Sequence, residues 1–117
     1  MRHNFLNLEV WKRSRNLVKE IYLSSQKFPS EEKFGLTSQL RRSAISVPSN
    51  ISEGCGRGTV PQLKNFLDIA IGSLCELETQ VYLSFDLGYI KLELSQKLLD
   101  EITQIRKMIL GFQKSLR

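Results

Sequence analysis

Apolar residues recur every three or four positions along four separate stretches of this chain, and no stretch keeps a sustained alternation of apolar and polar residues. A spacing of three to four is typical of an amphipathic helix, whereas alternation would indicate a strand. We therefore expect four helices, over about residues 8–25, 36–51 and 60–87, and from residues 91–95 to the C-terminus. The apolar positions of the last helix form a heptad pattern suited to bundle packing; they are Leu98, Ile102, Ile105, Ile109, Phe112 and Leu116.

Helix-breaking residues separate these stretches. Pro29 ends the first, a glycine-rich run over residues 54–58 ends the second, and Gly88 ends the third. Thr59 and Gln62 have the spacing of a capping box, so the third helix is expected to begin there. Short links between long amphipathic helices favour antiparallel neighbours. The sequence predicts one all-α domain over residues 1–117, an antiparallel up-down-up-down four-helix bundle, with a short helical turn near Ser30 in the longest link.

Composition limits the environment of the chain. Hydrophobic residues make up 41% of its 117 positions, enough for one core, but no run approaches the ~20 apolar residues that span a bilayer. The N-terminal residues do not have the pattern of a secretory signal. Two cysteines without metal-ligand spacing indicate reduced thiols. We expect a soluble cytoplasmic protein with no membrane contact and no cofactor.

Basic residues are concentrated in the first half of the chain. Residues 1–64 hold eleven Lys and Arg against five Glu, while residues 65–117 hold six against seven Asp and Glu, within a net charge of +5. This imbalance suggests an acidic partner such as RNA or DNA, although charge that serves only solubility remains an alternative.

Eight cations could form a surface that follows the phosphate backbone, because guanidinium groups donate two hydrogen bonds to phosphate. The alternative is a solvated face whose long side chains cover apolar edges. Base-specific recognition is not expected, since Trp11 and Tyr22 fit the core. The candidate nucleic-acid-binding residues are Lys12, Arg13, Arg15, Lys19, Arg41, Arg42, Arg57 and Lys64.

A line of polar residues follows one flank of the second helix. It could be a recognition strip toward another subunit or a nucleic acid, or it could satisfy backbone groups near Pro48. Its mixture of charge signs favours structural or inter-subunit packing. The line consists of Gln39, Arg42, Ser46, Asn50 and Glu53.

Small or apolar residues also lie off the apolar stripe of the third helix. Several on one long helix favour an oligomer contact, although single exposed hydrophobic residues are ordinary. They are Ile69, Gly72, Cys75 and Leu83. At the edge of the stripe, Glu78 requires a partner if buried, and we expect an Arg or Tyr from across the bundle.

Catalytic arrangements are poorly represented. The single histidine, His3, lies near the N-terminus, and Glu76 and Glu78 point to different faces of their helix. The glycine-rich run at residues 54–58 follows a helix and lacks the Lys-Ser/Thr ending of a phosphate loop. We predict no enzyme, no catalytic residue and no metal site; a metal-dependent nuclease is the least favoured hypothesis.

Four motifs give the chain a resemblance to a known family. They are GLTSQLRR at residues 35–42, SVPSNISEG at 46–54, FLDIAIGSLCELET at 66–79 and LGYI at 87–90. The chain resembles the four-helix bundle proteins encoded in intervening sequences of 23S ribosomal RNA genes. More distantly, it is similar to the accessory variability determinant of diversity-generating retroelements. The resemblance implies a ring-like homopentamer; in the retroelement relative, a basic pentamer binds reverse transcriptase and nucleic acid.

Two functions stay open at this stage. The first is a homo-oligomeric binding module, a pentamer by the resemblance, that contacts the RNA or DNA backbone as an accessory to a reverse transcriptase or another nucleic-acid enzyme. The second is a protein–protein adaptor or assembly protein whose basic charge is incidental. Ser43 and Cys55 depart from the usual family pattern, and neither departure affects the expected fold.

Overall fold

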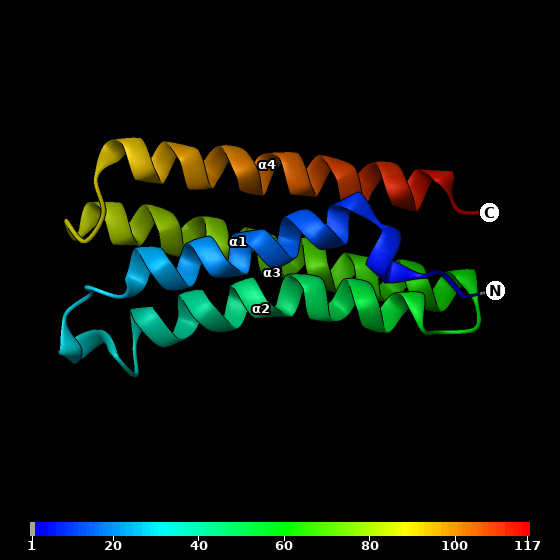
Figure 1. Cartoon of the computed structure of the whole chain (residues 1–117), viewed down its shortest axis with the longest axis horizontal. Coiled ribbons are helices and arrows are strands. Elements are labelled where there is room, and N and C mark those ends of the chain that lie inside the picture. Colours follow the sequence, from blue (N-terminus) through cyan, green and yellow to red (C-terminus); the bar gives the residue numbers. More distant parts are fainter. Residues whose placement is uncertain (1) are drawn as a thin grey trace.

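The computed structural model describes residues 2–117 and contains four long helices. A one-turn 3₁₀ helix precedes the first long helix, and another lies between the first two (Figure 1). No residue from 2 to 117 lies in a strand, so the prediction of an all-helical, four-helix chain is confirmed. The elements are η1 (Phe5–Asn7), α1 (Glu9–Ser25), η2 (Ser30–Glu32), α2 (Leu36–Cys55), α3 (Val60–Asp86) and α4 (Leu92–Ser115).

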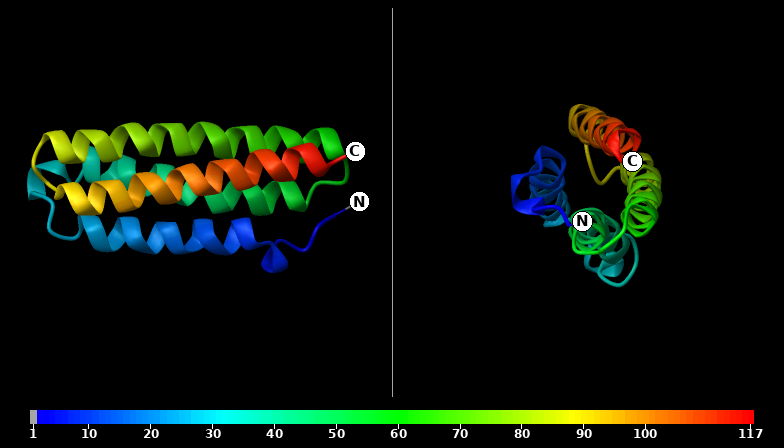
Figure 2. Two further views of the ribbon diagram at one scale, coloured as in Figure 1. Left: turned by 90° about the horizontal axis from the view of Figure 1, so that it is seen from above. Right: turned by 90° about the vertical axis from the view of Figure 1, so that its right-hand side faces the viewer.

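The four helices lie side by side in an elongated body of 45 × 25 × 20 Å. Each helix packs on the next along the chain, with the most extensive contact between α2 and α3 and the least between α1 and α4. Hydrogen bonds join residue 78 of α3 to residue 106 of α4, and residue 68 to residue 113, so these two helices run in opposite directions. Both described termini lie at one end of the body (Figure 2).

The core lies between the four apolar stripes. Apolar residues that are less than 2% exposed come from every helix, and most of them are on the stripes expected from the sequence. Burying each such side chain stabilises the fold by about 1.5–3 kcal/mol before entropy is counted. The largest are Leu17, Ile21, Ile51, Leu63, Leu67, Leu74, Leu77, Ile102, Ile105 and Ile109. The expectation for the first helix was partly wrong, because Leu17 is buried although it was not assigned to the stripe, whereas Tyr22, expected in the core, is 38% exposed.

The helix ends follow local chemistry. The Oγ1 of Thr59 accepts a hydrogen bond from the backbone amide of Gln62 at 3.3 Å, as the capping box predicts. The second helix continues to Cys55, four residues beyond the expected end at residue 51. Cys55 is fully buried, and Gly54 lets the last turn of α2 approach α3 closely. Packing against α3 therefore extends a helix that the glycine-rich sequence alone would end earlier.

Candidate nucleic-acid interface

Three of the eight predicted cations form an exposed ridge on α1, here called the α1 ridge: Lys12, Arg15 and Lys19. They are three or four residues apart, so they project from the same flank of the helix. Together with Asn16 they line one shallow hollow. The guanidinium of Arg15 lies 5.6 Å from the centre of the Trp11 ring, which keeps its charge on the surface. None of the three forms an ion pair with a carboxylate within residues 2–117.

A second group of cations comes from segments at the end of the body where the termini lie, and we call it the basic end: Arg2, Arg57, Lys64 and Lys114. The Nε of Arg2 donates to the carbonyl of Gly56 at 2.8 Å, in the turn that joins α2 to α3. Lys64 and Lys114 line a common hollow between the start of α3 and the end of α4. The antiparallel return of α4 thus adds cations to those of the α2–α3 turn.

Other predicted cations contact the protein itself. The Nε of Arg13 donates to Glu101 Oε2 at 3.1 Å on α4, and this hydrogen bond raises the pKa of the arginine. Arg41 donates to the Oγ of Ser25 at 3.0 Å, with its guanidinium 4.5 Å from the centre of the Tyr22 ring.

Arg57 also contacts its own chain. Its guanidinium forms a salt bridge with the Glu53 carboxylate at 2.9 Å and lies 4.8 Å from the centre of the Phe66 ring. Arg42 is exposed on α2. The eight candidates therefore do not form one continuous surface: the structure gathers Lys12, Arg15 and Lys19 on α1, and Arg57 with Lys64 at the basic end.

Most of the polar strip on α2 makes contacts within the chain. The hydroxyl groups of Ser46 and Ser73 lie 2.7 Å apart across the α2–α3 seam. The Nδ2 of Asn50 donates to the Ser46 carbonyl at 2.8 Å and to its Oγ at 2.9 Å. Because these bonds tie α2 to α3 and to itself, they agree with a structural role for this part of the strip. Gln39 and Arg42 remain exposed.

The proposed oligomer-contact residues all lie on the exposed side of α3. Ile69 is 44% exposed and Leu83 is 45% exposed, and Cys75 is exposed as well. A side-chain carbon added at Gly72 would have no heavy atom within 4 Å. This face is therefore not used in packing the single chain.

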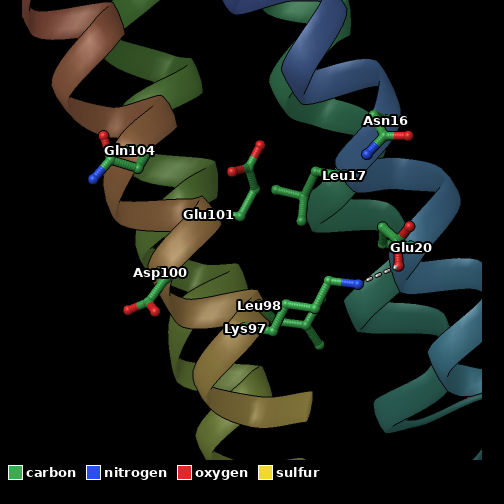
Figure 3. Close-up of a pocket in the computed structure, with 8 residues that line it drawn as sticks. All are labelled: Asn16, Leu17, Glu20, Lys97, Leu98, Asp100, Glu101 and Gln104. Atoms are coloured by element: carbon green, nitrogen blue, oxygen red, sulfur yellow. Dashed lines mark ion pairs between the residues drawn. The ribbon is translucent and has the colours of Figure 1, made fainter. Parts of the chain in front are cut away.

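A hollow of about 470 Å³ lies between α1 and α4 (Figure 3). Glu101 points across the gap toward α1, where it pairs with Arg13, and Lys97 reaches the carboxylate of Glu20 at 3.8 Å. Glu101 and Glu20 are each paired with a cation, so they form salt bridges between α1 and α4, which contact each other less than the other neighbouring pairs of helices do. Residues 2–117 contain no group of three or more His, Cys, Asp and Glu side chains that could hold a metal ion.

The partner expected for Glu78 is present. Arg106 of α4 approaches Glu78 of α3 at 3.2 Å, and both side chains are partly buried. The two residues are 28 positions apart in the sequence, so no local sequence pattern predicts that they pair.

Sequence reasoning missed two kinds of surface residue. Arg2 and Lys114 were not among the predicted cations, although the expected return of the last helix would have placed residue 114 near the start of the third. Phe34 was not noted either, yet it is 89% exposed in the loop before α2. Its sequence position between Lys33 and Gly35, in a link outside every amphipathic stripe, was the available signal.

Four long helices joined by hydrogen bonds and salt bridges between neighbours make this a four-helix bundle protein. Within that class, the chain belongs to the 23S rRNA-intervening sequence protein family, whose sequence model matches residues 6–111. A solved structure from Bacteroides thetaiotaomicron, described as a protein with unknown function from the S23 ribosomal protein family, shares the fold with a TM-score of 0.80. It is 24% identical, and the similarity covers 90% of this chain and 98% of that one. No curated protein matches. No helix in residues 2–117 combines the length and apolar character needed to cross a membrane.

Proposed function

We propose that this chain is a non-enzymatic, oligomeric helical bundle that binds the phosphate backbone of RNA or DNA. The observation that carries the proposal is the α1 ridge, three adjacent cations that have no carboxylate partner within residues 2–117. When lysine and arginine side chains contact phosphates, the counterions condensed on the nucleic acid are released, which favours binding at low salt. The basic end adds a second, separate group of cations near the termini.

The family adds support of a different kind. Its description refers to 23S ribosomal RNA, and the B. thetaiotaomicron relative is assigned to a ribosomal protein family. The first description refers to an intervening sequence of ribosomal RNA and the second to a protein of unknown function from a ribosomal protein family, so they support a ribosomal RNA setting and do not describe a contact with RNA. We propose a cytoplasmic accessory role beside a nucleic-acid enzyme such as a reverse transcriptase, in which the bundle supplies charge and the enzyme supplies chemistry.

The proposal includes self-association into a ring of five up-down-up-down bundles. The exposed face of α3 formed by Ile69, Gly72, Cys75 and Leu83 supports a contact between copies, because it buries nothing within the chain. A ring of five would also multiply the net charge of +5 that each copy carries, which strengthens attraction to nucleic acid at low salt.

A mobility-shift titration against a single-stranded RNA and a DNA duplex, at several salt concentrations, tests nucleic-acid binding. The informative variant is Lys12→Gln with Lys19→Gln, which removes two ridge charges. Loss of two phosphate contacts should reduce the slope of log K against log salt by about 1.8 per chain for duplex DNA. The matched control is Lys33→Gln with Lys107→Gln, which removes the same charge from exposed positions elsewhere.

Each outcome of that titration has a definite meaning. A reduced slope in the ridge variant, with an unchanged slope in the control, supports the site. Equal losses in the two variants contradict the ridge as the binding surface. The absence of any shift at low salt would end the nucleic-acid proposal, and cleavage of the probe on addition of divalent metal would contradict the non-enzymatic assignment.

A protein–protein adaptor is the second candidate. This candidate is favoured because Arg13, Arg41 and Arg57 already contact side chains of the same chain. Fewer cations are therefore available to bind phosphate. In this case the protein would assemble and bind a protein partner, but would give no mobility shift with RNA or DNA at any salt concentration.

A further inference from the structure

The α1 ridge continues into an exposed aromatic ring. Tyr22 lies three residues after Lys19 and seven after Arg15, so helical spacing places it on the same flank of α1. Its side chain is 38% exposed, although the sequence pattern predicted a place in the core. From Lys12 to Tyr22 the flank extends for about 15 Å along the helix. The three ridge cations and this ring therefore form a single line on α1.

A further cation reaches this line from α2. The start of α2 returns beside the end of α1 (Figure 1), and the guanidinium of Arg41 lies 4.5 Å from the centre of the Tyr22 ring. The Nε of Arg41 donates to the Oγ of Ser25 at 3.0 Å, and its Nη2 donates to the carbonyl of Tyr22 at 3.4 Å. These bonds hold the guanidinium plane beside the ring before any partner binds. Little side-chain ordering is then needed when a partner arrives.

No acidic residue adjoins this pair along either helix. The positions three and four residues from Tyr22 in α1, and from Arg41 in α2, hold neutral or basic side chains. Arg41, like the ridge cations, forms no ion pair with a carboxylate within residues 2–117. The surface around the ring is therefore complementary to a polyanion, as the α1 ridge is. The adjoining positions hold Val18, Lys19, Ser25 and Gln26 in α1, and Thr37, Ser38, Ala44 and Ile45 in α2.

An exposed ring among cations that can bind phosphate is suited to single strands. In a duplex the faces of the bases are stacked on one another, whereas an unpaired base can stack on an aromatic ring or on a guanidinium plane. Proteins that bind single strands combine a positively charged surface that follows the backbone with aromatic side chains that stack on bases. The Tyr22–Arg41 pair offers both kinds of stacking surface at one end of the ridge.

We infer that this protein binds single-stranded nucleic acid by stacking an unpaired base on the Tyr22–Arg41 pair, while the α1 ridge contacts the neighbouring phosphates. This inference rests on the proposed function, to which it adds the class of nucleic acid and a residue that carries no charge. Stacking involves the face of a base and not its edge, so it confers little preference for sequence.

Two single strands of equal charge test the stacking. One is a short DNA oligonucleotide of mixed sequence, and the other has the same length but carries an abasic sugar at every position. Fluorescence anisotropy at one low salt concentration gives the affinity of the protein for each strand. The wild type should bind the strand with bases about tenfold more tightly than the abasic strand.

Three variants assign that difference to the ring. Tyr22→Leu removes the ring and keeps an apolar side chain, so it should bind the two strands with equal affinity. Tyr22→Phe keeps the ring and should retain the preference of the wild type. Tyr82→Leu is the matched control, because Tyr82 is 53% exposed on α3, and it should retain the preference as well. Circular dichroism should show the same helical content in all of them.

A DNA duplex provides the third probe. Because its bases are covered, the ratio of single-strand to duplex affinity should fall by about tenfold in Tyr22→Leu relative to the wild type. Equal binding of the two single strands by the wild type, or a Tyr22→Leu protein that keeps either the preference for bases or the ratio, would overturn the inference. The proposed function would survive those results, because binding through phosphates would persist. The absence of binding to all three probes would contradict the proposed function itself and this inference with it.

Discussion

Replacing Gly54 with alanine should destabilise the protein, although alanine is the better helix former. A Cβ at this position would lie 2.9 Å from the Cδ1 of Leu63 and 2.9 Å from the Cβ of Phe66. The leucine methyl group belongs to a flexible side chain, but the phenylalanine Cβ is fixed to the backbone of α3. The two helices must therefore move apart, and such overpacking costs about 1–3 kcal/mol.

The helix propensity of alanine offsets part of that cost, by about 1 kcal/mol. We expect a net loss of up to about 2 kcal/mol in the free energy of unfolding, with the middle of the range at about 1 kcal/mol. At about 4 °C per kcal/mol, the Tm should fall by up to about 8 °C. Urea unfolding and thermal melts followed by circular dichroism measure both quantities, at one protein concentration because self-association also changes Tm.

Gly111→Ala is the matched control for Gly54→Ala. Gly111 lies inside α4, and a Cβ there would have no heavy atom within 4 Å. The free energy of unfolding of this variant should rise by about 0.5–1 kcal/mol, from helix propensity alone. A Gly54→Ala protein that is stabilised as much as Gly111→Ala would refute the close approach of α2 to α3.

Two further predictions concern titratable groups. The hydrogen bond that Tyr89 donates to Glu32 raises the pKa of the phenol, so its contribution to stability is complete below the ordinary value near 10 and is lost as pH rises through the raised value. Melts from pH ~8 to ~11 should therefore show a steeper alkaline loss of Tm in the wild type than in Tyr89→Phe, and parallel curves would contradict this. Burial raises the pKa of the Cys55 thiol while Cys75 is exposed, so native protein should react rapidly with a thiol reagent at one cysteine only. Cys75→Ser should abolish that fast reaction, and reaction of both thiols at similar rates in the folded protein would show that Cys55 is accessible.

The sequence predicted where the helices lie better than it predicted which side chains contact each other between them. Thr59 and Gln62 located the start of α3 because a capping box is a local hydrogen-bond pattern. Glu78 was correctly expected to need a partner, since its place beside the apolar stripe implied partial burial, but Arg106 could not be named. The end of α2 was set too early because the packing of Cys55 against other helices overrides the local preference of glycine for a turn.

The candidate site was predicted only in part. Lys12, Arg15 and Lys19 share a flank because helical spacing is a property of consecutive residues. Arg13 is one position from Lys12, yet it pairs with Glu101, which is 88 residues away in the sequence. No local pattern contains that pairing, because it depends on the rotation of α1 relative to α4.

By itself, the sequence determined four amphipathic helices, their order, and an excess of positive charge in the first half, because each of these follows from composition or from a period of 3.6 residues. Only the tertiary structure decided which cations remain without a carboxylate partner, which polar residues join α2 to α3, and that Phe34 stands in solvent. Those outcomes depend on the register and rotation between helices, which are set by contacts among residues that are distant along the chain.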